Sequence, residues 1–290
     1  MKVLTLFLFS LFQFVSCQDP VNKNEGFENH NHEFEAVVPQ DTMKESGLLF
    51  ERISPPGGFR RIELPNGSFG FYLRNLPLKE EGALVQYYNG QSKARRDIYV
   101  DVIDLPIGEK DLHQCADAVM RLRAEYLWSN ERYEDIHFNL TNGMRVDYKK
   151  WMDGFRVDVQ GNKTKWVKKK NPANTHEILW SYLEFVFTYA GTASLSKELP
   201  SINARDIHIG DVFIQGGFPG HAVIVLDMAV NEEGEKLMLL GQSYMPAQEI
   251  QILANPNDSG ISPWYTTNFG QELITPEWTF SSKDVKQFTN

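Results

Sequence analysis

The sequence predicts an α+β fold with a central antiparallel sheet and helices packed against it. Short apolar runs bounded by turn residues are typical of strands, and longer segments with apolar residues three and four apart are typical of helices. Apolar residues make up 42% of the 290-residue chain and aromatic residues 12%. A core of that size needs no disulfide to hold it together.

Two segments, 222–226 and 236–240, are the most strand-like parts of the chain. The turn residues of 231–234 join them into a hairpin. Both runs are almost continuously apolar, which is typical of strands covered on both faces. We therefore expect this hairpin at the centre of the sheet rather than at its edge.

The strongest helical pattern covers about 109–128, and a second helix is expected over about 175–190, beginning at a cap at Asn174 or Thr175 and ending near Gly191. The apolar positions of the first helix recur at helical spacing: Leu112, Cys115, Val119, Leu122 and Tyr126. This pattern places Cys115 on the buried side, about two turns after the expected helix start.

Weaker strand signals complete the expected order of elements. Segment 69–73 has a strand-like composition, and 98–103 alternates so that Ile98, Val100 and Val102 should share one face. Aromatic and charged residues alternate over 136–170 between turn residues, which predicts a meander of strands. The part after Asn255 is broken by prolines and is expected to be an irregular wrap.

The first 17 residues have the pattern of a bacterial signal peptide, with a charged start, an apolar run and small residues before Cys17. Residues 14–17 also resemble a lipobox, which implies a lipid on Cys17; ordinary cleavage and secretion is the alternative. Residues 18–46 are polar and predict a disordered tether, so 47–290 is the expected single domain. These features predict an exported, lipid-anchored cell-envelope protein, with the membrane face left open.

Charge and cysteine content narrow the classes of function. The net charge is −9, or −10 once Lys2 leaves with the signal peptide, so the chain has no basic surface for nucleic acid. Cys17 and Cys115 are its two cysteines. If Cys17 is acylated or removed, Cys115 has no partner for a disulfide within the chain.

A histidine follows a glycine-rich loop at the start of the buried strand. Segment 210–225 contains Gly210-Asp211, then Gly216, Gly217 and Gly220-His221, then Ala222-Val-Ile-Val225. This pattern resembles the histidine motif of the NlpC/P60 and CHAP cysteine hydrolases. The resemblance implies a papain-like core, here with insertions, and a nucleophilic cysteine near a helix start, for which Cys115 is the mature candidate.

In this interpretation Cys115 attacks and His221 takes its proton, because a thiol needs a base to become a good nucleophile. We expect Gln242 to orient the imidazole and the Cys115 N–H to bind the oxyanion. Asp211 is the second choice, for orienting the imidazole or for a structural contact. Ser243 and Tyr244 follow the second buried strand, where a binding pocket often opens. The long spacing from Cys115 to His221 and the expected mid-helix position of Cys115 favour the other interpretation, a core cysteine.

Three longer segments, 104–128, 210–221 and 241–248, resemble the DUF4846 family, and the resemblance extends over most of the chain from about Gly47. It implies a bacterial origin, chiefly Bacteroidetes, and a lipoprotein, but no activity. The sequence has no zinc-ligand spacing and no phosphate-binding loop, so neither a metal nor a cofactor is expected.

Two functions stay open on the sequence alone, and a metal site built on His221, for which the sequence has no second ligand motif, is a weaker third. The first is a cysteine amidase or peptidase that acts on peptidoglycan peptides through Cys115 and His221. The alternative is a non-catalytic envelope lipoprotein that binds glycan, peptide or another envelope protein, for which Trp264 and Tyr265 offer aromatic surface. The oligomeric state is not predicted by the sequence.

Overall fold

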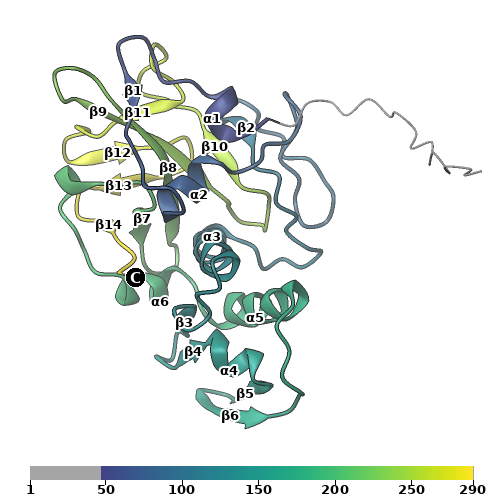
Figure 1. Cartoon of the computed structure of the whole chain (residues 1–290). Coiled ribbons are helices and arrows are strands. Elements are labelled where there is room, and N and C mark those ends of the chain that lie inside the picture. Colours follow the sequence, from purple (N-terminus) through teal and green to yellow (C-terminus); the bar gives the residue numbers. More distant parts are fainter. Residues whose placement is uncertain (1–46, 290) are drawn as a thin grey trace, which may run out of the picture. The chain divides into compact units, whose positions relative to one another are not determined.

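The computed structural model describes residues 47–289 (Figure 1). The expected signal peptide, Cys17 and the tether lie outside these residues. Within 47–289, no helix combines the length and the apolar character that a bilayer crossing requires. The described part mixes helices with an antiparallel sheet, as the sequence predicts.

The helices are short except for two. They are α1 (Leu49–Arg52), α2 (Phe69–Arg74), α3 (Cys115–Ser129), α4 (Tyr148–Met152), α5 (His176–Tyr189), α6 (Thr192–Glu198) and the 3₁₀ turn η1 (Ala204–Asp206). Helix α5 matches the expected second helix within a residue at each end, and Thr175 is its N-cap.

The main sheet has the strand order β14-β7-β8-β9-β10-β2, with β1 added on β8 and β11 on β9. Its strands are β1 (Arg60–Arg61), β2 (Tyr99–Val102), β7 (Val212–Gln215), β8 (His221–Val230), β9 (Lys236–Gln242), β10 (Gln251–Leu253), β11 (Trp264–Thr266) and β14 (Val285–Lys286). Three hairpins stand apart: β3 (His137–Asn139) with β4 (Arg145–Asp147), β5 (Phe155–Gln160) with β6 (Lys163–Lys168), and β12 (Glu272–Ile274) with β13 (Thr279–Ser281).

The hairpin β8–β9 forms the middle of the sheet, as its continuous apolar sequence predicts. Alternate residues of β8 enter two different cores. Ala222 and Ile224 pack in the cluster that contains the helices, whereas Val223 and Val225 pack in a second cluster with the aromatic rings of the C-terminal strands. Burial on both faces explains why β8 has no polar alternation.

Helix α3 begins at Cys115, six residues later than the sequence pattern suggests. The carboxylate of Asp117 accepts a hydrogen bond from the backbone N–H of Gln114, which caps the helix at that point. Residues 109–114 form turns and loop instead. The expectation that Cys115 lies two turns inside the helix is therefore wrong: it is the first helical residue.

Helix α3 is buried on nearly all sides. It packs on β8 within the larger core, and the guanidinium of Arg121 stacks on Trp180 of α5 with 4.8 Å from its central carbon to the ring centroid. Figure 1 shows α3 between the sheet and α5. The buried positions include Arg121 and Arg123, so these arginines are not on an ordinary helix surface.

Two strand predictions in the first half are corrected by the structure. Residues 69–74 form helix α2 instead of a strand, because the Ser68 hydroxyl accepts from the N–H of Phe71 and caps a helical turn. Strand β2 begins only at Tyr99. Ile98 before it and Val102 within it are buried, but Val100 is 44% exposed, while Tyr99 and Asp101 are buried. A register shift in the pairing of β10 with β2 interrupts the alternation.

The later expectations are correct only in part. The region 136–170 is two separate hairpins with α4 between them, instead of one meander. The part after Asn255 adds β11 and β14 to the main sheet and also forms β12 and β13. Trp264 and Tyr265 lie on β11 and are each 1% exposed, so they pack in the cores and offer no surface to a glycan.

Candidate functional site

Cys115 lies at the start of α3, where the first backbone N–H groups of a helix have no partner within the helix. The backbone N–H groups of Ala222, Ala116 and Cys115 lie near the sulfur and each favours the thiolate. The side chain is 5% exposed. Burial raises the pKa of the Cys115 thiol to about 11, helped by the nearby carboxyl of Asp117, so burial outweighs the backbone donors.

A cavity of about 230 Å³ opens beside Cys115. One wall is the start of α3 and the loop before it, and another is the start of α6. The remaining lining comes from the end of α5, from the loop before β8 and from Met245 after β9. Phe218 in that loop is 98% exposed and Met245 is 41% exposed, so both present apolar surface at this cavity.

His221 is the first residue of β8 and is 1% exposed. Its ring packs among three aromatic rings, with centroid distances of 4.8 Å to Tyr244, 5.4 Å to Trp278 and 5.8 Å to Phe280. Burial lowers the pKa of the His221 imidazole to about 4, so the ring is neutral near pH 7.

Gln242, the last residue of β9, contacts His221 as the sequence analysis expects. The His221 Nε2 and Gln242 Oε1 atoms are 2.8 Å apart. An amide oxygen only accepts hydrogen bonds, so Nε2 of the neutral ring carries the proton and Nδ1 is the basic nitrogen. In this tautomer Nδ1 carries no proton.

The structure separates Asp211 from His221. Strands β7 and β8 are antiparallel, and the residue that pairs with His221 is Gln215, at the opposite end of β7 from Asp211. The Asp211 carboxylate accepts from the backbone N–H of His208 instead. Asp211 therefore does not orient the imidazole, because the four residues of β7 lie between them, and its contact is a structural one in the turn before β7.

Ser243 and Tyr244 occupy different positions after β9. The Ser243 hydroxyl is fully buried and lies 2.9 Å from the carbonyl oxygen of His113 and 2.7 Å from that of Gln248, so it holds the loop. Tyr244 packs against His221, and the electrostatic influence of Cys115 on its pKa places it near the thiol as well. Of these two residues, Tyr244 is the one beside the site.

Polar residues around Cys115 are more buried than their sequence positions suggest. His113 is 0% exposed and Asp117 is 6% exposed. Burial lowers the pKa of His113 to about 3 and raises the pKa of Asp117 well above its ordinary range. His113 is therefore neutral near pH 7, and the raised pKa of Asp117 reflects the cost of burying its charge.

Four residues beside the site were not predicted from the sequence: Lys93, Phe218, Glu277 and Trp278. Lys93 and Glu277 lie in loops that read as ordinary surface, and they are 184 positions apart. Only the fold brings such residues together. The exposed Phe218 within a glycine-rich loop is the one that sequence alone offers as unusual.

Thiol and imidazole lie on neighbouring elements without touching directly. Over residues 47–289, no hydrogen bond joins Cys115 to His221. The sulfur instead accepts from the backbone N–H of Ala222, the residue that follows His221. No cluster of three His, Cys, Asp or Glu side chains in this part of the chain has the geometry of a metal site.

The fold and the site define a mixed helix and sheet protein in which a cysteine at a helix start lies beside a histidine–glutamine pair on the central strands. The family described as Domain of unknown function (4846) matches residues 49–287, and the chain belongs to this family. No curated protein and no solved structure matches the chain.

Proposed function

We propose that the chain is a cysteine hydrolase that cleaves or transfers an amide bond in cell-wall peptides. One observation carries the proposal: Cys115 is the first residue of α3, lines a cavity, and meets the backbone N–H of Ala222, the residue after His221. A nucleophile needs both a place for its substrate and a base close by.

The proposed reaction passes through a thioester. The Cys115 sulfur attacks the amide carbon while the thiol proton moves to Nδ1 of His221, and the tetrahedral intermediate expels the amine, which takes that proton. Water then attacks the thioester with His221 again as base, which releases the acid and restores the thiol. The carbonyl oxygen would be stabilised by the N–H of Cys115 at the helix start.

The order of the three residues supports a papain-like core for this chemistry. The cysteine opens a helix, the histidine opens the next long strand β8, and the glutamine ends the adjacent strand β9. Residues 130–210 lie between the cysteine helix and the histidine strands and form β3–β6 and α4–α6. We interpret this region as an insertion that accounts for the long spacing.

A binding protein on the same scaffold is the second candidate. It is favoured by the 5% exposure of Cys115 and by the burial that raises the pKa of its thiol to about 11. In this case the cavity would hold a ligand through Phe218 and Met245 without cleaving it. The two candidates differ in one measurable way, namely whether a new amine appears.

The test is to incubate the full chain with purified peptidoglycan and with its soluble peptides, and to follow new amino groups by mass spectrometry. Cleavage that disappears in Cys115→Ala and in His221→Ala but persists in Cys17→Ala supports the hydrolase. Cleavage that survives Cys115→Ala would reject the mechanism. Saturable binding without cleavage would favour the binding protein.

We also propose that the chain is an exported lipoprotein anchored through Cys17. The signal-peptide and lipobox pattern of residues 1–17 supports this proposal, and a lipid on Cys17 would hold the protein in the cell envelope. In a bacterial host, wild type should fractionate with membranes and Cys17→Ala should not. Equal distribution of the two proteins would contradict lipidation.

A further inference from the structure

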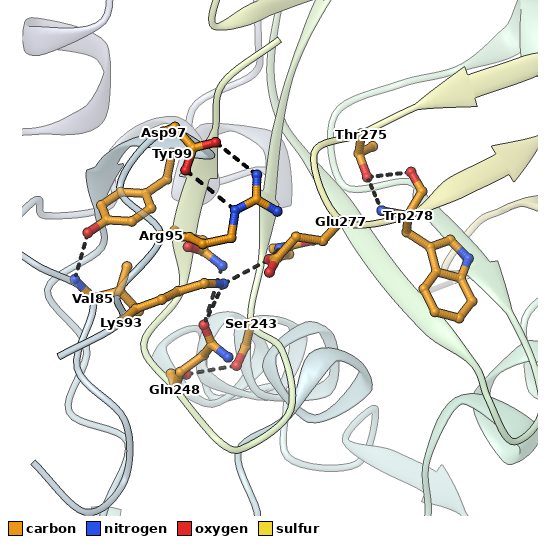
Figure 2. A network of polar contacts seen from close by, with 12 residues as sticks. Val85, Lys93, Arg95, Asp97, Tyr99, Ser243, Gln248, Thr275, Glu277 and Trp278 are labelled. Atoms are coloured by element: carbon orange, nitrogen blue, oxygen red, sulfur yellow. Dashed lines mark hydrogen bonds and ion pairs between the residues drawn. The ribbon is translucent and has the colours of Figure 1, made fainter. Parts of the chain in front are cut away.

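A chain of hydrogen bonds continues from Gln242 away from His221. The Gln242 side-chain N–H donates to Oε2 of Glu277 at 2.7 Å, and the Lys93 ammonium donates to the same oxygen at 2.8 Å. Gln242 is 2% exposed and Lys93 is 4% exposed. Figure 2 shows Lys93 between Glu277 and Gln248.

Gln242 alone does not decide which nitrogen of His221 carries the proton. A glutamine amide has an accepting oxygen at one end and a donating NH₂ at the other. With the oxygen toward the ring, His221 must carry its proton on Nε2. With the NH₂ toward the ring, Nε2 must accept, and the proton moves to Nδ1.

Glu277 removes this choice. An ionised carboxylate only accepts hydrogen bonds, so the NH₂ of Gln242 must face Glu277 and its oxygen must face His221. Lys93 donates to the same carboxylate oxygen, and an ammonium has no acceptor to offer in return. The bonds from Lys93 to His221 therefore have one consistent direction.

We propose that Glu277 and Lys93 are positioning residues that hold His221 in the tautomer with a free, basic Nδ1. Its use in catalysis rests on the proposed function, but the tautomer itself does not. In the opposite tautomer Nδ1 already carries a proton and takes none from Cys115. Neither residue lines the cavity; Glu277 reaches the ring through Gln242, and Lys93 reaches Gln242 through Glu277.

Lys93 is itself held in place by a second acceptor. Its ammonium donates to Oε1 of Gln248 at 2.9 Å, and the Gln248 amide nitrogen donates to the carbonyl of Pro246. These bonds tie Lys93 to the loop that carries Tyr244 and the cavity residue Met245. The lysine thus links the orientation of His221 to the position of this loop.

The test reads the tautomer directly, by NMR of ¹⁵N-labelled histidine in the full chain near pH 7, with His221→Ala used to assign the signal. We expect wild type to carry the proton on Nε2 alone. In Glu277→Ala we expect about half of the molecules to carry it on Nδ1, because either end of the Gln242 amide can then face the ring. Glu272→Ala is the matched control and should keep the wild-type signal, because Glu272 is an exposed residue of β12 whose side chain is not part of this network.

A second variant restores the direction of the bonds by exchanging the two groups. In Gln242→Glu/Glu277→Gln a carboxylate faces His221 and accepts from Nε2, so the wild-type tautomer should return. If Glu277→Ala does not fold, Glu277→Leu removes the acceptor while filling the space and serves the same comparison. A wild-type tautomer that persists in the folded single variant would overturn the proposal.

Amide cleavage is measured on the same proteins to keep the two proposals apart. A tautomer change in Glu277→Ala with a cleavage rate that falls in proportion supports both proposals. A tautomer change in a protein that never cleaves peptides supports the positioning role and rejects the hydrolase. Cleavage by wild type with no tautomer change in the variant rejects the positioning role alone.

Discussion

The pH dependence of Cys115 alkylation tests how burial controls the thiol. The measurement uses Cys17→Ala, in which Cys115 is the single remaining cysteine of the chain. Burial raises the pKa of this thiol to about 11 and lowers that of His221 to about 4. Between these values both groups are uncharged, so no thiolate–imidazolium pair exists before a substrate binds.

The expected alkylation rate depends on two opposing quantities, the fraction of Cys115 that is thiolate and the nucleophilicity of that thiolate. At pH 8 a thiol with a pKa of about 11 is ionised in about one molecule in 1,000, whereas a free thiol with a pKa of about 8.5 is about one quarter ionised. The more basic thiolate is roughly 10-fold more nucleophilic across this difference. Alkylation by iodoacetamide should therefore be about 20-fold slower than for a free thiol, before any loss of access.

The shape of the pH profile separates ionisation from access. Limited access slows the reaction by the same factor at every pH, whereas the pKa decides where the rate stops rising. We expect the rate to rise about tenfold per pH unit up to about pH 10, with little change in this shape in His221→Ala. A plateau below pH 8 that is lost in His221→Ala would refute the reasoning, because it would reveal an ion pair at rest.

Two further predictions concern stability, both measured by urea unfolding. Asp227 is fully buried, and each of its oxygens accepts a hydrogen bond from an arginine at 2.7 Å, Arg74 and Arg61. Asp227→Ala should therefore cost about 3 kcal/mol or more, whereas Asp97→Ala, which breaks an exposed ion pair, should change stability far less. Equal losses would contradict the buried ion pairs. Burial lowers the pKa of His113 to about 3, so this imidazole binds a proton more tightly in the unfolded chain than in the folded one. The contribution of His113 to the free energy of unfolding is therefore complete above about pH 6.5 and is lost as the pH falls toward 3. Between pH 7.5 and 5, wild type should lose about 2 kcal/mol more than His113→Phe, and parallel losses would rule out the neutral buried imidazole.

The sequence was most informative where burial shows directly in the pattern. Strands β8 and β9 have apolar runs that only a central position explains, and both the hairpin and its place in the sheet were predictable. Gln242 was predictable as well, because counting across a hairpin of known turn gives the neighbours of His221 within a residue or two. Helix α5 followed from its periodicity.

The rest depended on contacts between distant residues. The start of α3 was missed because Gln114 is a rare N-cap residue, and the stabilising bond comes from Asp117 three residues on. No local sequence pattern marks Lys93 or Glu277, since each is a polar residue in a loop. Their burial depends on the long-range contact between them. Asp211 was misplaced because a Gly-Asp pair before a strand does not tell at which end of that strand the site lies.

The bond between Lys93 and Glu277 has a consequence for the order of folding. It closes a segment of 184 residues, and contacts between such distant positions form late because the intervening chain must first become compact. A folding intermediate that already has the β8–β9 hairpin and α3 would still lack the groups that fix the direction of the Gln242 amide. The imidazole would then acquire its final tautomer only in the last stage of folding.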